Sequence, residues 1–201
     1  NKSTSSFSNF IMAPFANRID GAAFEFGGEA FTLPMNRPEQ NCAIHGHARE
    51  APWTIETQTA DSLVLETEFN RDDTPYQFTC RTGFSVSNGS LVQSLWIRND
   101  GDRTLPFGFG LHPWFPMDDQ TQLELNVDVA FDTDDRTFPL GLTDVEGNLD
   151  FSTPSPVKPR AGLDKPFAGW TSRKATIYQP TSDYALDISA RGALTNVHVF
   201  I

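Results

Sequence analysis

The segment FSVSNGSLVQSLWIRN, residues 84–99, gives the clearest local indication of how this chain folds. Asn88-Gly89 stands between two runs that are rich in β-branched and apolar residues. This dipeptide favours a two-residue β-turn because Asn and Gly both accept the positive φ angles that the turn requires. We therefore predict a β-hairpin, with one strand over 84–87 and the returning strand over 90–99.

Alternation of apolar and polar residues continues on both sides of this hairpin. No window of 11 or more residues has the i, i+3, i+4, i+7 spacing of an amphipathic helix. About ten short strands separated by turn residues predict an all-β fold, an antiparallel sandwich or barrel, formed as a single domain over 1–201. The other predicted strands are two short ones within 24–33 around Gly27-Gly28, and 53–58, 62–69, 76–81, 123–131, 174–179, 185–188 and 195–201.

Three segments interrupt the strand pattern and are rich in Gly, Pro and aromatic residues. They cover 34–53, 104–120 and 138–170, and we expect each of them to be a long loop. Loops of this length in a compact domain usually carry function, because they present side chains on a rigid scaffold.

The composition argues against several classes of partner. The 201-residue chain has a formal net charge of -11, so it repels nucleic-acid phosphates and anionic membranes, whereas a neutral ligand meets no such penalty. No run of 18 apolar residues is present, so we predict no membrane span. The polar, Ser-rich start lacks the pattern of a signal peptide, which favours a cytoplasmic location. Cys42 and Cys80 lack the spacing of a zinc site, so we expect buried thiols, with a disulfide between them as the alternative.

Four side chains in turn-like segments, each near aromatic residues, are the candidates for chemistry: Arg18, His45, His112 and Asp164. A guanidinium, two imidazoles and a carboxylate supply donors and acceptors for hydroxyl groups, while aromatic rings stack on the apolar face of a sugar. The structural alternatives are a surface ion pair for the arginine, solvated or core imidazoles, and a turn role for the aspartate.

Other patterns favour structural roles. His45 and His47 form an HxH pair, but without further ligands we predict no metal site. The acidic run 132–135 lacks the Gly and the distal Glu of a calcium loop, so we expect a solvated turn. His198 alternates within a predicted strand and is expected to be structural.

Taken together, the local motifs resemble the aldose 1-epimerase family, also called galactose mutarotases, in their order along the chain. The resemblance covers about residues 10–170 and implies the galactose-mutarotase-like antiparallel β-sandwich, or supersandwich. Its motifs are Pro-Phe-Ala-Asn-Arg-Ile at 14–19 followed by Gly21 and Phe24, Leu33-Pro34 with Asn36, Asn41 with Ile44-His45-Gly46, Trp53, His112-Pro113-Trp114-Phe115 and Gly162-Leu163-Asp164.

The resemblance also implies a role for each candidate residue. His112 is similar to the general acid that protonates the ring oxygen, and His45 to the histidine near the ring oxygen and the anomeric end. Arg18 and Asp164 are similar to the arginine and the aspartate that bind sugar hydroxyls. The family's general base is a glutamate on a strand shortly after 196–201, a position that this sequence lacks, so we expect a chain truncated at its C-terminal end. Only a short lead precedes the first predicted strands, so we expect truncation at the N-terminal end as well. The resemblance implies no metal and no organic cofactor.

The implied chemistry fits these residue types. Mutarotation opens the sugar ring and recloses it on the other face of the carbonyl, so a base and an acid must exchange protons with the anomeric hydroxyl and the ring oxygen. Each positioned proton transfer contributes about 10²–10⁴ in rate, and a histidine with a pKa of about 6.5 can give and retake a proton near neutral pH. We therefore predict exchange of the α and β anomers of a free hexose, galactose or glucose, by a monomer or homodimer, with severely reduced turnover if the protein lacks the base.

Two alternatives stay open at this point. A hexose-6-phosphate mutarotase would hold a phosphate with basic residues such as Arg37, Arg49 and Arg71, although the acidic balance disfavours this. A non-catalytic carbohydrate-binding β-sandwich needs no acid at the ring oxygen, and a fold alone does not exclude it. The catalytic interpretation predicts that the four candidate side chains meet on one concave face lined by Trp and Phe.

Overall fold

The computed structural model describes residues 9–201, which form two compact units, one ending at Trp114 and the other running from Phe115 to Ile201. In this part of the chain, the strands of every sheet pair in antiparallel fashion, and the helices are single 3₁₀ turns. The predicted all-β, antiparallel class is therefore confirmed. Within this part of the chain, no helix has the length and apolarity needed to cross a membrane.

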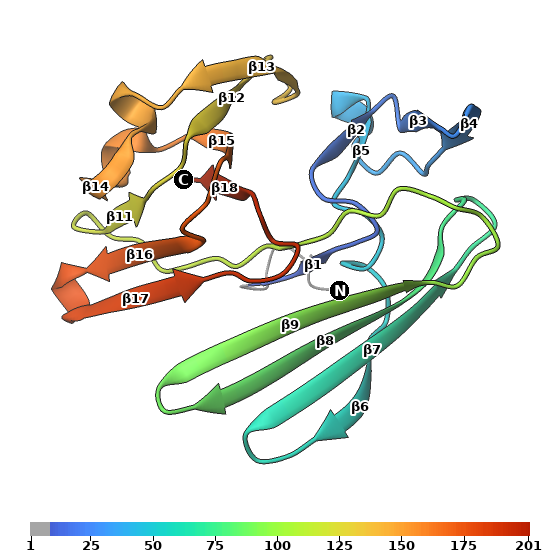
Figure 1. The fold of residues 1–201 in the computed structure, drawn as a ribbon, viewed down its shortest axis with the longest axis horizontal. Helices are drawn as coiled ribbons and strands as arrows, with labels where there is room; N and C mark the ends of the chain where they lie inside the picture. The colour runs from blue at the N-terminus through green and yellow to red at the C-terminus, as the bar shows by residue number, and fades with distance from the viewer. Residues whose placement is uncertain (1–8) are drawn as a thin grey trace. The chain divides into compact units, whose positions relative to one another are not determined.

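A four-stranded sheet dominates the first unit, in the order β6-β7-β8-β9 (Figure 1). The predicted hairpin is confirmed: Ser87 pairs with Ser90, and Asn88 and Gly89 have φ angles of 48° and 73°.

The predicted break between 81 and 84 is wrong, because β8 continues through Gly83. A Cβ at Gly83 would lie 2.8 Å from Ser94 Oγ, so glycine here admits a close neighbour without ending the strand. The bounds are β6 Thr54–Gln58, β7 Ser62–Asn70, β8 Gln77–Ser87 and β9 Ser90–Asn99.

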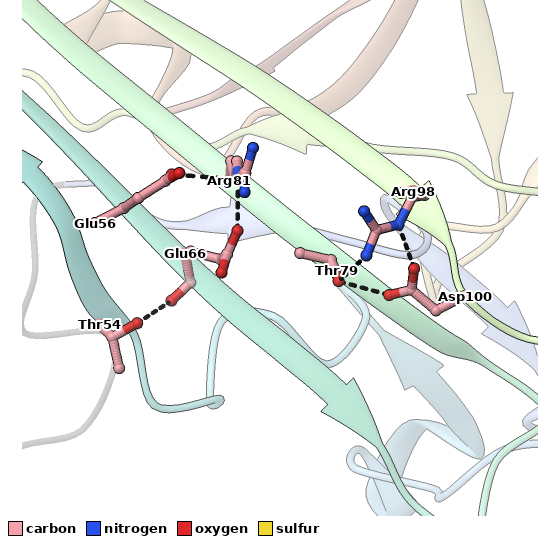
Figure 2. Close-up of polar contacts among 7 residues, drawn as sticks. All are labelled: Thr54, Glu56, Glu66, Thr79, Arg81, Arg98 and Asp100. Atoms are coloured by element: carbon pink, nitrogen blue, oxygen red, sulfur yellow. Dashed lines mark hydrogen bonds and ion pairs between the residues drawn. The ribbon is translucent and has the colours of Figure 1, made fainter.

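The two faces of this sheet have different chemistry because side chains alternate along each strand. One face contributes Phe78 and Cys80 to a core that also contains Phe31, Phe69 and Tyr76. The other face carries polar pairs (Figure 2): Arg81 is bound to Glu66 and Glu56, and the Thr79 hydroxyl donates to Asp100 at 2.5 Å. The ion pairs of Arg81 are partly exposed and contribute little to stability, so the aromatic core holds this unit together.

Three pairs of very short strands complete the first unit. The predicted turn between residues 26 and 29 is confirmed as the β3–β4 hairpin. The segments 34–53 and 104–120 are not continuous loops, because each contains a strand of two or three residues that pairs with an earlier part of the chain. The pairs are β1 Ile11–Met12 with β10 Gly110–Leu111, β2 Arg18–Asp20 with β5 Cys42–Ile44, and β3 Ala23–Phe26 with β4 Glu29–Thr32; the 3₁₀ turn η2 covers Pro38–Gln40.

The second unit contains two four-stranded sheets around Phe151, Phe167, Leu125 and Trp170. Their orders are β14-β11-β16-β17 and β13-β12-β15-β18 (Figure 1). The bounds are β11 Gln122–Leu125, β12 Val129–Thr133, β13 Pro139–Asp144, β14 Phe151–Pro156, β15 Asp164–Ala168, β16 Lys174–Gln179, β17 Tyr184–Ser189 and β18 Val197–Phe200; the 3₁₀ turns are η3 Gly147–Leu149, η4 Lys158–Arg160 and η5 Pro180–Ser182.

Two expectations for the second unit are wrong. The predicted strand 123–131 is two strands, β11 and β12, in different sheets. The expected loop 138–170 contains β13, β14 and β15. The prolines in this segment obscured its strand pattern. Two of its strands, β13 and β14, lie at the edge of a sheet, where proline is tolerated because the N–H that it lacks can face away from the neighbouring strand.

Candidate functional site

His112 follows directly after β10 and is held against the start of β1. Its backbone N–H donates to the Phe10 carbonyl at 3.0 Å, which continues the pairing of Ile11 with Leu111. The Phe10 ring stacks on the imidazole with a centroid distance of 4.3 Å, and the Trp114 ring stacks on it at 5.3 Å. Two nearly parallel aromatic rings therefore fix the plane of His112, and Trp114, 45% exposed, brings an aromatic surface to the site.

His45 reaches the same place from the end of β5. His45 and Gly46 have φ angles of 62° and 65°, and the His45 N–H donates to the Asn17 carbonyl at 2.9 Å. Gly46 packs so closely on Ala13 that an added Cβ would lie 2.1 Å from the Ala13 carbonyl oxygen. This tight turn brings the His45 ring to 5.4 Å from the His112 ring, centroid to centroid, with the two planes nearly perpendicular.

Arg18 lies beside this turn on the neighbouring strand. It is paired with Ile44 in the β2–β5 ladder, one residue before His45. Its Nε donates to Gln40 Oε1 and its Nη1 to Asn17 Oδ1, both at 3.2 Å. The first unit thus brings three of the four predicted residues into one neighbourhood, through two short strand pairs.

Asp164, the fourth predicted residue, begins β15 in the second unit. Its Oδ1 lies 2.5 Å from Nε2 of His198, a residue expected from the sequence to be only structural. The predicted meeting of Asp164 with the other three side chains stays a prediction.

Two residues in the His112 neighbourhood were not predicted as site residues. Phe10 stands at the end of a polar, Ser-rich segment, and no local pattern identified it. The Arg49 guanidinium lies over Phe10, with Cζ 5.0 Å from the ring centroid. Burial lowers the pKa of Arg49, while the charge of Glu50, 3.6 Å away, opposes this shift. The side chain is only 13% exposed, so a cation is held close to the aromatic stack.

His47 has different surroundings from its neighbour His45. Its ring stacks on Phe69 at 4.8 Å, and its Nε2 lies 3.4 Å from the Thr74 hydroxyl. Burial, followed by the charge of Arg71, lowers the pKa of His47 to about 4. The imidazole is therefore neutral at pH 7 and lies half-buried against Phe69, a core residue of the first unit.

His47 predicts a loss of stability in mild acid. Its pKa is 6.5 when unfolded and about 4 when folded, so protonation favours the unfolded chain as the pH falls from 6.5 towards 4. At about 1.4 kcal/mol per pKa unit the full effect is at most ~3.5 kcal/mol, and partial solvent exposure reduces it. Urea unfolding at pH 7 and pH 5 should show a smaller stability difference for His47→Gln than for the wild type. Equal stability differences in the two proteins would contradict the lowered pKa assigned to His47.

Comparison with known proteins places this site in a family context. Residues 2–200 match the family described as aldose 1-epimerase. The Escherichia coli K12 protein YphB, itself uncharacterized, is 31% identical over 179 residues, which are 88% of this chain and 60% of YphB. YihR, another uncharacterized protein of the same organism, is 27% identical over 150 residues, 68% of this chain and 46% of YihR. The chain thus spans 60% or less of the length of these curated relatives.

Solved structures agree with the family match. A crystal structure of an E. coli K12 protein, provisionally assigned as an aldose 1-epimerase, superposes with a TM-score of 0.85 at 30% identity, over 92% of this chain and 62% of that one. A galactose mutarotase-like protein from Clostridium acetobutylicum superposes with a TM-score of 0.80 at 15% identity, over 95% and 63%, which shows a shared fold. The predicted galactose-mutarotase-like fold class is therefore confirmed. Because the family match extends over nearly the whole sequence, the chain belongs to the aldose 1-epimerase family.

Proposed function

We propose that this protein interconverts the α and β anomers of a free hexose, galactose or glucose. The observation that carries the proposal is the His45–His112 pair, two imidazoles 5.4 Å apart beside Phe10 and Trp114. An acid able to protonate the ring oxygen is one of the two proton-transfer groups that ring opening requires, and a second imidazole and an aromatic surface supply contacts for holding the sugar.

Each predicted residue has a role in this proposal. His112 protonates the ring oxygen as the ring opens and retakes the proton as it closes, while its stacked position keeps the imidazole oriented. His45 hydrogen-bonds near the ring oxygen and the anomeric carbon. Arg18 and Asp164 bind sugar hydroxyls. The base that removes the anomeric proton, a glutamate by the family resemblance, is assigned to no residue of this sequence.

The proposal is tested by following anomer exchange directly. Two-dimensional NMR exchange spectroscopy of galactose and of glucose measures the α–β conversion rate at equilibrium. We expect the protein to accelerate exchange of at least one of the two sugars above the buffer rate. In a protein that has its base, sugar binding with exchange no faster than in buffer would favour a carbohydrate-binding module instead.

A phosphorylated hexose is a second candidate substrate, and one observation favours it. Of the three basic residues considered for a phosphate, Arg37 and Arg71 form ion pairs with Glu39 and Asp73 and are about half exposed. Arg49 is also paired, with Glu50 at 3.6 Å, but it differs in lying against the Phe10 ring that stacks on His112. A cation in this position could pair with a phosphate on the sugar.

Replacing Arg49 with methionine separates the two substrates. For a free-hexose enzyme, we expect Arg49→Met to change kcat/KM for glucose and glucose 6-phosphate by the same factor. If Arg49 holds the phosphate, the loss of a charge-assisted hydrogen bond, about 1.5–3 kcal/mol, would lower kcat/KM for glucose 6-phosphate alone by about 10–150-fold. Arg71→Met, at an exposed ion pair, serves as the matched control.

We also propose that the protein acts in the cytoplasm. Cys42 and Cys80 are both buried thiols, as predicted, and form no disulfide with each other. Burial raises the pKa of Cys80 to about 12, so its thiol is unreactive. Buried thiols of this kind are typical of proteins from reducing compartments.

A further inference from the structure

The pairing of β15 with β18 gives Asp164 and His198 a common face. Asp164 pairs with Phe200, and Pro166 pairs with His198, so Asp164 and His198 are diagonal neighbours in the ladder. Phe167 and Val199, which alternate with them along the two strands, point the other way into the core. The Asp164–His198 pair therefore lies on the outer face of this sheet, next to Phe200, which is 54% exposed.

The contact between the two side chains is short and directional. His198 Nε2 lies 2.5 Å from Asp164 Oδ1, and the side chains are 35% and 24% exposed. A hydrogen bond with this exposure contributes little to folding stability, so its main consequence is the orientation of the carboxylate. A carboxylate has about four acceptor sites, so the bond to His198 leaves Asp164 able to accept hydroxyl donors as well.

We propose that His198 is a positioning residue, which holds Asp164 in the orientation that receives sugar hydroxyls. This inference rests on the proposed function, because it assumes that Asp164 binds the sugar. His198 acts through the carboxylate and does not touch the reacting atoms. Removing it should weaken sugar binding and leave the proton-transfer step unchanged.

A double-mutant cycle on the full chain tests this role. We expect His198→Ala to raise the KM for galactose about 3–10-fold, the effect of one hydrogen bond, with kcat within about 2-fold. Glutamine places an amide N–H where Nε2 was, so His198→Gln should restore KM to within about 2-fold. In an Asp164→Ala background, His198→Ala should have no further effect, because the group that it orients is gone.

The matched control is the Tyr178–Glu124 hydrogen bond on the other sheet of the same unit, at 2.6 Å. Tyr178→Phe removes a bond of similar length to a carboxylate, and we expect it to leave KM unchanged. An unchanged KM for His198→Ala, or the same penalty with and without Asp164, would overturn the proposal. A lower kcat with unchanged KM would also overturn it, because His198 would then act on the reacting atoms.

Failure of the positioning role is distinguishable from failure of the proposed function. If the wild type exchanges anomers and His198→Ala does so with the same KM, only the positioning role fails. If the wild type binds galactose without exchanging its anomers, the double-mutant cycle is measured through the Kd for galactose. The changes expected in KM are then expected in Kd, and the same results would overturn the positioning role. If the wild type neither binds nor exchanges a hexose, the proposed function fails, and the positioning role with it.

Discussion

Replacing His112 with alanine should reduce anomer exchange by about 10²–10⁴-fold, the contribution of a positioned general acid. The imidazole stacks on Phe10 and Trp114, and this stacking fixes the plane of the ring. Sugar affinity depends mainly on other groups, so it should change by less than about 10-fold. NMR exchange spectroscopy gives the rate, and calorimetric titration with the sugar gives the affinity.

Two variants distinguish proton transfer from simple packing at His112. His112→Gln keeps a hydrogen-bonding group of similar reach but cannot transfer a proton, so its exchange rate should stay as low as that of the alanine variant. Phe10→Leu loosens the stack and keeps the imidazole, so we expect a smaller loss of exchange. If His112→Ala or His112→Gln retained the wild-type exchange rate, the catalytic assignment would be wrong.

Replacing Gly46 with alanine should destabilise the first unit by about 2–5 kcal/mol, the sum of left-handed backbone strain and forced contact. Its φ angle is 65°, and the new Cβ would lie 2.1 Å from the carbonyl oxygen and 2.3 Å from the carbonyl carbon of Ala13. Backbone atoms cannot rotate away as a flexible side chain can, so the turn must open. Because His45 precedes Gly46, we also expect a loss of anomer exchange in the protein that remains folded.

Gly27 in the β3–β4 turn provides the control for Gly46. Its φ angle is 61°, nearly the same, but no atom lies within 4 Å of an added Cβ. Gly27→Ala should therefore cost only the left-handed conformation, about 1–2 kcal/mol, and should leave exchange intact. Urea unfolding measures both variants. Equal losses of unfolding free energy would show that the close approach to Ala13 does not constrain the turn.

The sequence predicts the longer strands well because the residue pattern that defines each of them lies within the strand and its turn. Asn88-Gly89 sets the turn chemistry, and β7 and β9 are long enough to show a period of two. The strands β1, β2, β5 and β10 have two or three residues each, too few to show a period, and they form only because distant segments pair with them. The prolines of β13 and β14 indicate a loop until the sheet order shows that both strands lie at an edge.

Residues of the candidate site were predictable where a residue type suited to the chemistry stands within a recognisable local motif. His45 and His112 were identified from residue type and local sequence, and the structure brings their rings together. Phe10 has no such signal, because its place against His112 depends on pairing between the two ends of the first unit. The contact of His198 with Asp164 was not predicted for a similar reason, because it depends on the register of β15 and β18.

The most direct test of the account is side-chain ¹H–¹⁵N NMR of the imidazoles during a titration with galactose or glucose. We expect the signals of His45 and His112 to shift together, with one dissociation constant, while the signal of the half-buried His47 does not move. A sugar that is turned over at saturating concentration while His45 and His112 stay unperturbed would contradict the assignment of these two imidazoles to the active site.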